Sequence, residues 1–213
     1  MRQALLTFES QMENSASIPN FQKYNKRMNY PTVFDLIAEV TQASGVRLIL
    51  IGGFAINAYG VARNTLDVDF LISEADYQKL TDPLSAQGYK ESVRTDVFVK
   101  YEHKDRGAMP IDLLFVDPNT FEMIWRGGGE STISGHRFKT PSLLHLIALK
   151  LHAIKKGSKD RVWKDLPDII NLVIANRMDV SSSDFVEICR KFGPEGIHQK
   201  IQEASRGDFD GRS

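Results

Sequence analysis

The stretch at residues 48–72, LILIGGFAINAYGVARNTLDVDFLI, restricts the fold more than any other part of the chain. Residues 48–51 are continuously apolar, which is typical of a strand buried on both faces, and Gly52 and Gly53 interrupt the run. Glycines let a backbone pass close to a ligand because they lack a Cβ atom. A helix beginning just afterwards, at Phe54, would point its free N–H groups at the turn. The sequence therefore predicts a turn suited to phosphate.

A second apolar run, residues 66–72, carries two carboxylates. Asp67 and Asp69 are two residues apart, and side chains alternate along a strand, so both project from one face. A third acid, Asp112, interrupts another short apolar strand at residues 109–115. If these strands pair, three carboxylates converge and suit one or two hard divalent cations. Mg²⁺ fits best, with Mn²⁺ as the alternative, because Mg²⁺ keeps several waters and bridges substrate phosphates.

The order of these motifs resembles the nucleotidyltransferase superfamily of the DNA polymerase β type. The glycine pair, the fourteen-residue step from Gly53 to Asp67, the Asp67-x-Asp69 strand and the distal Asp112 all follow that pattern. The resemblance implies an α/β (α+β) fold, with a mixed-sheet catalytic domain and a C-terminal helical bundle. It also implies that Asp67, Asp69 and Asp112 bind the metal and serve catalysis, while Gly52 and Gly53 face the phosphates of an NTP such as ATP.

A looser resemblance extends into the second half of the chain. Residues 146–153, LIALKLHA, and residues 164–169, KDLPDI, are similar to the C-terminal helices of nucleotidyltransferase-like toxins of type IV abortive-infection systems. This resemblance implies that Lys150 is an active-site residue, although leucine precedes it where methionine is frequent. Arg63 and Thr65 resemble the Arg-x-Thr lead-in of many bacterial members, which implies that both help to bind the nucleotide.

Simpler interpretations of these residues stay open. Thr65 either contacts phosphate or orients an Asp, and threonine is also an ordinary strand residue. Asp112 taken alone would also suit an ion pair with a nearby Lys or Arg. Lys150 lies on a helix with an apolar face, so a solvated position beside that face is the alternative to a phosphate contact. Asp165 and Asp168 are expected to cap a helix or to pair with nearby basic residues, Lys164 and Arg161.

The overall charge is balanced, with 27 basic and 27 acidic residues. No bulk electrostatic field therefore draws the chain to nucleic acid or to an anionic membrane, and an RNA substrate would need a local basic patch. One such basic patch is present, made of Lys150, Lys155, Lys156, Lys159, Arg161 and Lys164. Charged residues grouped in this way usually form a solvated face of a helix.

The patterns divide the chain into an N-terminal arm at 1–30, a catalytic domain at 31–139 and a helical region at 140–213. With 42% hydrophobic residues, 213 residues suffice for one core plus a helical appendage.

The glycine run at 126–130 is expected to be a flexible turn. The expected helices are 31–43, 75–87, 142–156, 163–176, 183–191 and a weaker segment after 194; the expected strands also include 89–93, 97–103 and 110–116.

Cysteine usage and the apolar runs indicate a compartment. The single Cys189 excludes an internal disulfide, and residues 1–14 lack the basic start and apolar core of a signal peptide. No apolar run approaches the ~20 residues that span a bilayer. The sequence therefore predicts a cytoplasmic protein without a membrane partner.

Together these patterns favour a metal-dependent enzyme that moves a nucleoside monophosphate from an NTP to an acceptor hydroxyl. The acceptor stays open: a tRNA end, as for a toxin with an antitoxin partner, a protein side chain or a small molecule. The alternative is a nucleotide-binding regulatory protein of the same fold with little or no transferase activity. The presence of all three acids argues against that alternative, because decay would remove a metal ligand.

Overall fold

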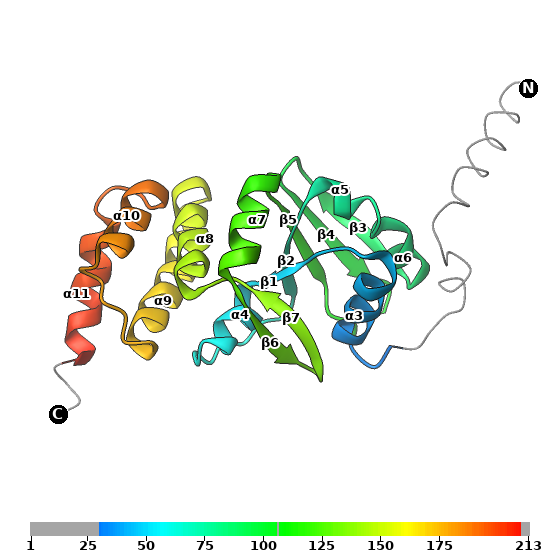
Figure 1. The fold of residues 1–213 in the computed structure, drawn as a ribbon, viewed down its shortest axis with the longest axis horizontal. Helices are drawn as coiled ribbons and strands as arrows, with labels where there is room; N and C mark the ends of the chain where they lie inside the picture. The colour runs from blue at the N-terminus through cyan, green and yellow to red at the C-terminus, as the bar shows by residue number, and fades with distance from the viewer. Residues whose placement is uncertain (1–29, 106, 210–213) are drawn as a thin grey trace, which may run out of the picture.

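A computed structural model describes residues 30–105 and 107–209 of the chain. The arm expected at 1–30 lies outside these residues, except for Tyr30. A mixed sheet and its covering helices form one part of the molecule, and a row of helices packs against one side of it (Figure 1). No helix within the described residues is both long enough and apolar enough to span a bilayer.

The described residues form a seven-stranded sheet with the order β3-β4-β5-β2-β1-β7-β6. In its centre, β2 lies antiparallel to β1 and parallel to β5. This arrangement confirms the expected mixed sheet. It also meets the condition for the three acids to converge, because the two acid-bearing strands pair. The strands are β1 (Ile49–Ile51), β2 (Val68–Ile72), β3 (Tyr89–Arg94), β4 (Phe98–His103), β5 (Ile111–Phe115), β6 (Gly129–Ile133) and β7 (His136–Thr140).

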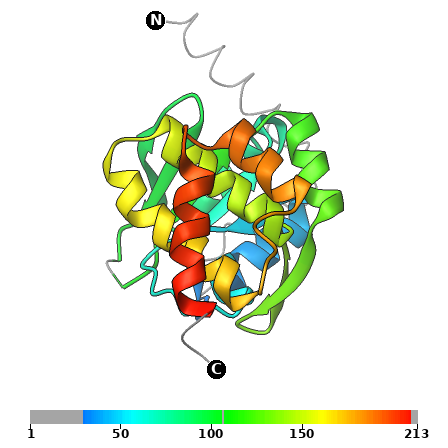
Figure 2. The ribbon, with the colours of Figure 1, turned by 90° about the vertical axis from the view of Figure 1, so that its left-hand side faces the viewer.

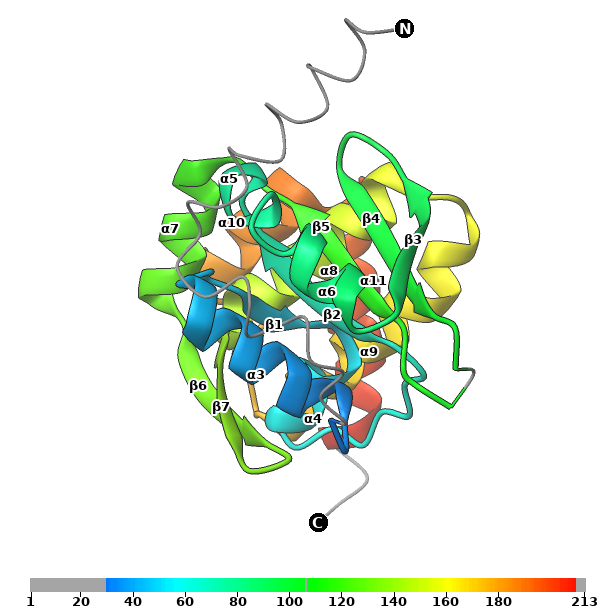
Figure 3. The same ribbon diagram turned by 90° about the vertical axis from the view of Figure 1, so that its right-hand side faces the viewer.

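One face of the sheet is covered by α3 (Val33–Ser44), α5 (Glu74–Tyr77) and α6 (Thr81–Ala86), which lie in front of the strands in Figure 3. Helix α3 begins with a reciprocal hydrogen-bonded cap between Thr32 and Asp35 and ends at Gly45, which has a φ of +67°. Alternate residues of β2, among them Val68 and Phe70, join the main apolar core beneath these helices.

The opposite face of the sheet carries the side chains that alternate with these core residues along each strand. Here α7 (Pro118–Gly127) packs Phe121 and Ile124 against Leu71 of β2 and against β1. Asp69 alternates with Val68 and Phe70, so it lies on this second face together with Leu71. The acid-bearing face is therefore the one that turns toward α7 and the C-terminal helices.

The C-terminal helices are α8 (Leu143–Lys156), α9 (Asp160–Ala175), α10 (Ser183–Phe192) and α11 (Ile197–Phe209). Helix α11, in red, lies nearest the viewer in Figure 2 and at the end of the molecule away from the sheet in Figure 1. Their shared core includes Ala55 and Ile56 of α4 (Gly52–Ala58), the short helix after β1. Tyr59 adds a polar link, because its hydroxyl donates to the Pro141 carbonyl at 2.6 Å. The helical region is thus anchored directly behind the glycine pair.

Two local predictions were wrong. The helix expected at 75–87 is two helices, α5 and α6, because Pro83 has no N–H for a continuous helix and is tolerated only in a first turn. The expected flexible turn at 126–130 instead joins the end of α7 to the start of β6. A Cβ atom on Gly128 would lie 3.0 Å from the Ile124 carbonyl, so this glycine serves close backbone packing.

Candidate active site

The three acids singled out by the sequence meet on the second face of the sheet. Asp69 of β2 and Asp112 of β5 are direct neighbours in the parallel register, and Asp67 lies one residue before β2 begins. Asp112 is buried, whereas Asp67 and Asp69 are half-buried. A single strand pairing thus brings together carboxylates that are more than forty residues apart in the sequence.

These carboxylates repel one another in a poorly solvated place. Burial, and then the charges of Asp67 and Asp112, raise the pKa of Asp69 from 3.8 to about 6. Burial also raises the pKa of Asp112, opposed mainly by Lys100, whose ammonium nitrogen lies 3.2 Å from Asp112 Oδ1. Lys100 stands directly opposite Asp112 on β4. A divalent cation would relieve this repulsion, and carboxylate oxygens are the ligands that Mg²⁺ prefers.

The acids are of the residue type that binds Mg²⁺, but their side chains are not arranged as a metal-binding site in this structure. Within residues 30–105 and 107–209, no group of three or more His, Cys, Asp or Glu side chains is arranged to hold a metal ion. Asp112 pairs with Lys100, and Asp67 accepts a hydrogen bond from Thr65. Binding an ion would therefore require Asp112 to exchange its ammonium partner for the metal.

The glycine pair makes room for the site residues. Gly52 has a φ of +62°, and a Cβ atom built on it would lie 2.6 Å from Asp69 Cγ. A Cβ atom on Gly53 would lie 2.7 Å from Thr65 Cβ. Helix α4 begins at Gly52 itself, two residues earlier than expected, and no side chain caps its N-terminus. Close approach to Asp69 and Thr65 thus gives a structural reason for both glycines.

We expect Gly52→Ala to destabilise the fold more than Gly45→Ala does. Gly45 has nearly the same positive φ, but a Cβ atom there meets nothing within 4 Å, so this control should lose only about 1–2 kcal/mol. At Gly52 the displaced Asp69 carboxylate should add roughly 1–3 kcal/mol. Urea unfolding of both variants measures the difference, and equal losses would show that Asp69 is not held against Gly52.

Thr65 and Arg63 order the segment that leads into β2. Thr65 Oγ1 donates to Asp67 Oδ1 at 2.7 Å, which supports the interpretation that Thr65 orients an Asp. The Arg63 backbone N–H donates to Asn57 Oδ1 at 2.7 Å, and Arg63 Nε lies 3.1 Å from Asp168 Oδ1. Arg63 therefore ties the lead-in segment to α9.

Lys150 is ion-paired rather than solvated. Its side chain is 11% exposed, and its ammonium donates to Asp165 Oδ1 at 2.9 Å and to Asp168 Oδ2 at 2.8 Å. The charge of Lys150 also offsets part of the rise in the pKa of Asp69, so the ammonium acts on the site acids as well as on α9. The solvated alternative for Lys150 was wrong, whereas a role in phosphate binding stays a prediction.

The partners expected for Asp165 and Asp168 were largely wrong. Both carboxylates are buried and pair with Lys150, fifteen and eighteen residues earlier. Of the local partners, Arg161 lies 3.6 Å from Asp165, and no ion pair among the described residues joins Lys164 to either acid. Helix α9 therefore turns these acids inward, toward α8 and Arg63.

Two further lysines face the acids. Lys100 pairs with Asp112 from the neighbouring strand β4, and the charge of Lys164 offsets part of the rise in the pKa values of both Asp69 and Asp112. Lys164 is exposed on the first turns of α9, so it stands at the open side of the site. The sequence analysis missed Lys100 as a partner of Asp112. The strand expected at 97–103 would identify this lysine only if its pairing with β5 were known.

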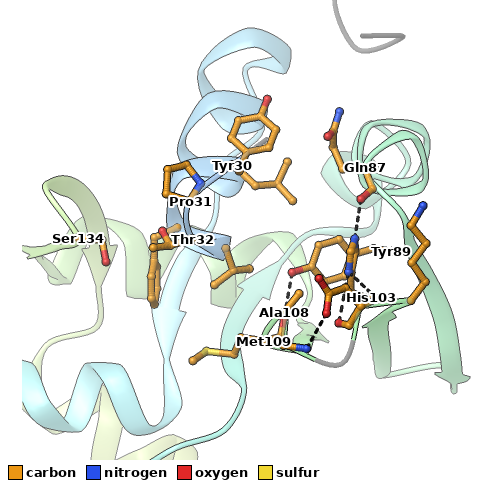
Figure 4. A pocket seen from close by; sticks show the side chains of 15 residues that line it. Tyr30, Pro31, Thr32, Gln87, Tyr89, His103, Ala108, Met109 and Ser134 are labelled. Carbon is orange, nitrogen blue, oxygen red and sulfur yellow. Dashed lines mark hydrogen bonds between the residues drawn. The ribbon is translucent and has the colours of Figure 1, made fainter. Parts of the chain in front are cut away.

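A separate cavity of about 710 Å³ lies on the other side of the sheet, between the start of α3 and the end of the β3–β4 hairpin (Figure 4). Tyr30, Tyr89, His103 and Met109 are among its lining residues, and none of the three site acids is. Its polar groups bond to one another: the Tyr89 hydroxyl donates to the Met109 carbonyl at 3.0 Å. This cavity is therefore distinct from the candidate active site.

Comparison with known proteins rests on structure, because no family model and no curated protein sequence matches the chain. An antigenic nucleotidyltransferase-like protein from Paracoccidioides brasiliensis superimposes with a TM-score of 0.50 and 16% identity, over 80% of this chain and 89% of that one. This chain has a nucleotidyltransferase fold. The expected resemblance is thereby confirmed for the fold.

Other nucleotidyltransferase structures align less closely. ANT(2")-Ia in complex with adenylyl-2"-tobramycin aligns at 14% identity and a TM-score of 0.48, over 83% of this chain and 97% of that one. A lincomycin-bound lincosamide antibiotic adenylyltransferase aligns at 18% identity and a TM-score of 0.46, over 64% and 91%. At these identities the likeness concerns the nucleotidyltransferase fold alone.

Proposed function

We propose that this chain is a Mg²⁺-dependent enzyme that transfers a nucleoside monophosphate from an NTP to an acceptor hydroxyl. The observation that carries the proposal is the register of β2 and β5, which sets Asp69 beside Asp112 with Asp67 next to them. The nucleotidyltransferase fold supports the same reaction class. Mn²⁺ is the alternative ion, and ATP is among the candidate nucleotides.

The proposed step is an in-line displacement at the α-phosphorus. The acceptor oxygen forms a bond to that phosphorus, the bond to the pyrophosphate oxygen breaks, and the hydroxyl proton passes to a carboxylate such as Asp112 or to water. When bound to Asp67, Asp69 and Asp112, Mg²⁺ would neutralise charge on the attacking and leaving oxygens.

This chain's own groups would supply positioning. Gly52 lies against Asp69 and Gly53 against Thr65, and their backbone N–H groups would bind the phosphates, while Arg63 and Thr65 hold the segment that leads into β2. The ammonium group of Lys150, which already pairs with Asp165 and Asp168, acts on Asp69 and would supply positive charge near the leaving group.

The biological setting is part of the proposal. The candidate acceptors are a tRNA end, a protein or a small molecule, and a cytoplasmic toxin with an antitoxin partner is the setting that the sequence resemblance suggests. The alternative is a nucleotide-binding regulator of the same fold. The three acids argue against this alternative, because a regulator would not require them to stay together.

The test is transfer of label from each of four α-³²P NTPs, with Mg²⁺, into total tRNA, a protein lysate and a panel of small hydroxyl compounds. We expect label from the wild type and at least a 10³-fold loss in Asp67→Ala/Asp69→Ala, since catalysis here rests on charge neutralisation. The double variant Asp82→Ala/Asp96→Ala removes two exposed acids as a control. NTP binding without any labelled acceptor would instead favour the regulator.

A further inference from the structure

A basic segment joins α8 to α9 at the open side of the candidate site. Residues 155–164, KKGSKDRVWK, contain five basic side chains and one acidic side chain in a protein whose total charge is balanced. Gly157 ends α8, and α9 begins three residues later at Asp160, so the segment spans the junction of the two helices. We call its exposed residues the basic ridge; they are Lys155, Lys156, Lys159, Arg161, Trp163 and Lys164.

Much of the positive charge on the basic ridge is not neutralised within the described residues. Lys156 and Lys159 make no ion pair there, and Lys155 donates only to a backbone carbonyl, that of Lys191 at 3.1 Å. Arg161 lies 3.6 Å from Asp165, a carboxylate already shared with Lys150. The ridge therefore presents a local positive field although the chain as a whole has none.

The same segment carries an exposed aromatic ring. Trp163 is 83% exposed, while the buried side of α9 holds Asp165, Asp168 and Ile169. Lys159 lies four residues before Trp163, so the two side chains are neighbours on the exposed side of α9. An exposed aromatic ring beside a cation is the combination that binds single-stranded nucleic acid: a base stacks on the ring while lysines meet the phosphates.

The basic ridge also leads to the candidate active site. Lys164, its last member, acts electrostatically on both Asp69 and Asp112, and Arg161 and Lys164 precede the two inward-facing acids of α9 by one turn. A chain that follows the ridge from α8 along α9 would thus arrive at the carboxylates. Unlike the cavity beside α3, the ridge therefore has a member that acts on the site acids.

We propose that the acceptor is the end of a single-stranded polynucleotide, which lies along the basic ridge with a base stacked on Trp163 and its terminal hydroxyl at the site acids. This inference rests on the proposed function for the transfer step, but the binding surface is independent of it. The other acceptors, a protein side chain or a small molecule, become outcomes of the test.

The first measurement is binding of a 5′-fluorescein-labelled 12-nucleotide single-stranded RNA by anisotropy, over a range of salt concentrations and without NTP. We expect Trp163→Ala to weaken binding about tenfold and Trp163→Phe to restore most of the affinity. Lys156→Gln/Lys159→Gln should reduce the slope of log affinity against log salt by about 1.4, because two phosphate contacts are lost. The control Lys90→Gln/Lys200→Gln removes two exposed lysines elsewhere and should match the wild type.

The second measurement separates this inference from the proposed function, by adding labelled NTP and following label into the RNA and into small hydroxyl compounds. Label in the RNA that falls with Trp163→Ala supports both. Equal RNA binding by ridge variants and wild type, or equal competition by a poly-glutamate peptide, overturns the inference. Label in small molecules alone also overturns it and leaves the proposed function standing. RNA bound through the ridge with no label in any acceptor overturns the acceptor role and the transferase together.

Discussion

Asp69→Asn is expected to make the metal-free protein more stable at pH 8 while it abolishes transfer. Burial and the charges of Asp67 and Asp112 raise the pKa of Asp69 to about 6, so the ionised carboxylate is held in an unfavourable place at neutral pH. An amide of the same shape removes that cost. With 1.36 kcal/mol for each pKa unit, the gain should be about 1–3 kcal/mol, or a rise in Tm of roughly 3–9 °C.

The pH dependence of this gain follows from the direction of the pKa shift. Near pH 3 the Asp69 carboxyl is protonated in both the folded and the unfolded state and contributes no difference. As the pH rises through the interval between 3.8 and about 6, the folded state keeps the proton longer, so the stability of the wild type falls. Above that interval the loss is complete. The advantage of Asp69→Asn should therefore appear between pH 4 and pH 6 and stay constant above it.

Thermal unfolding at pH 4.5 and pH 8, with and without Mg²⁺, measures these effects. Mg²⁺ should raise the Tm of the wild type at pH 8 and should leave Asp69→Asn almost unchanged, because a ligand that binds only the folded state stabilises it. Asp96→Asn, at an exposed acid in the turn between β3 and β4, is the control. A variant that unfolds more easily at pH 8 would show that the Asp69 charge is already compensated and that the acids do not form an ion site.

The sequence was sufficient to predict the part of the site that depends on strand geometry. Alternation along β2 and its pairing with β5 fix the positions of Asp69 and Asp112 once both segments are recognised as apolar strands. The glycine pair was also found, but its contacts were not. Whether Gly52 faces a phosphate or a carboxylate depends on how α4 leaves β1, and the structure puts Asp69 against it.

The sequence was not sufficient for interactions between distant segments. Asp165 and Asp168 have basic neighbours along the chain, so local pairing was the natural prediction. Their burial depends instead on how α9 packs against α8, which brings Lys150 within hydrogen-bond distance. The β6–β7 hairpin was also missed. Its turn residues, Ser134 and Gly135, both adopt positive φ, but β6 is largely exposed and neither flanking strand has an apolar pattern.

Replacing Lys150 is expected to cause the largest loss of stability among the site residues. Its ammonium is shared by Asp165 and Asp168, whose side chains are only 5% and 8% exposed. Lys150→Met keeps the apolar stem but leaves two buried carboxylates with Arg63 and Arg161 as their remaining cations. Removing one partner from a buried ion pair typically costs about 3–5 kcal/mol, and we expect a loss of that size.

Urea unfolding of a double-mutant cycle tests this expectation and decides what Lys150 does. Lys150→Met/Asp165→Asn should recover part of the loss, because the second change removes one uncompensated charge. Lys156→Met, on the exposed side of the same helix, should stay within about 0.5 kcal/mol of the wild type. If Lys150→Met instead unfolds like the wild type and loses only NTP affinity, the ion pairs contribute little, and Lys150 acts as a phosphate contact. A large stability loss would identify Lys150 as the residue that holds α9, and with it Lys164 and the basic ridge, in place beside the acids.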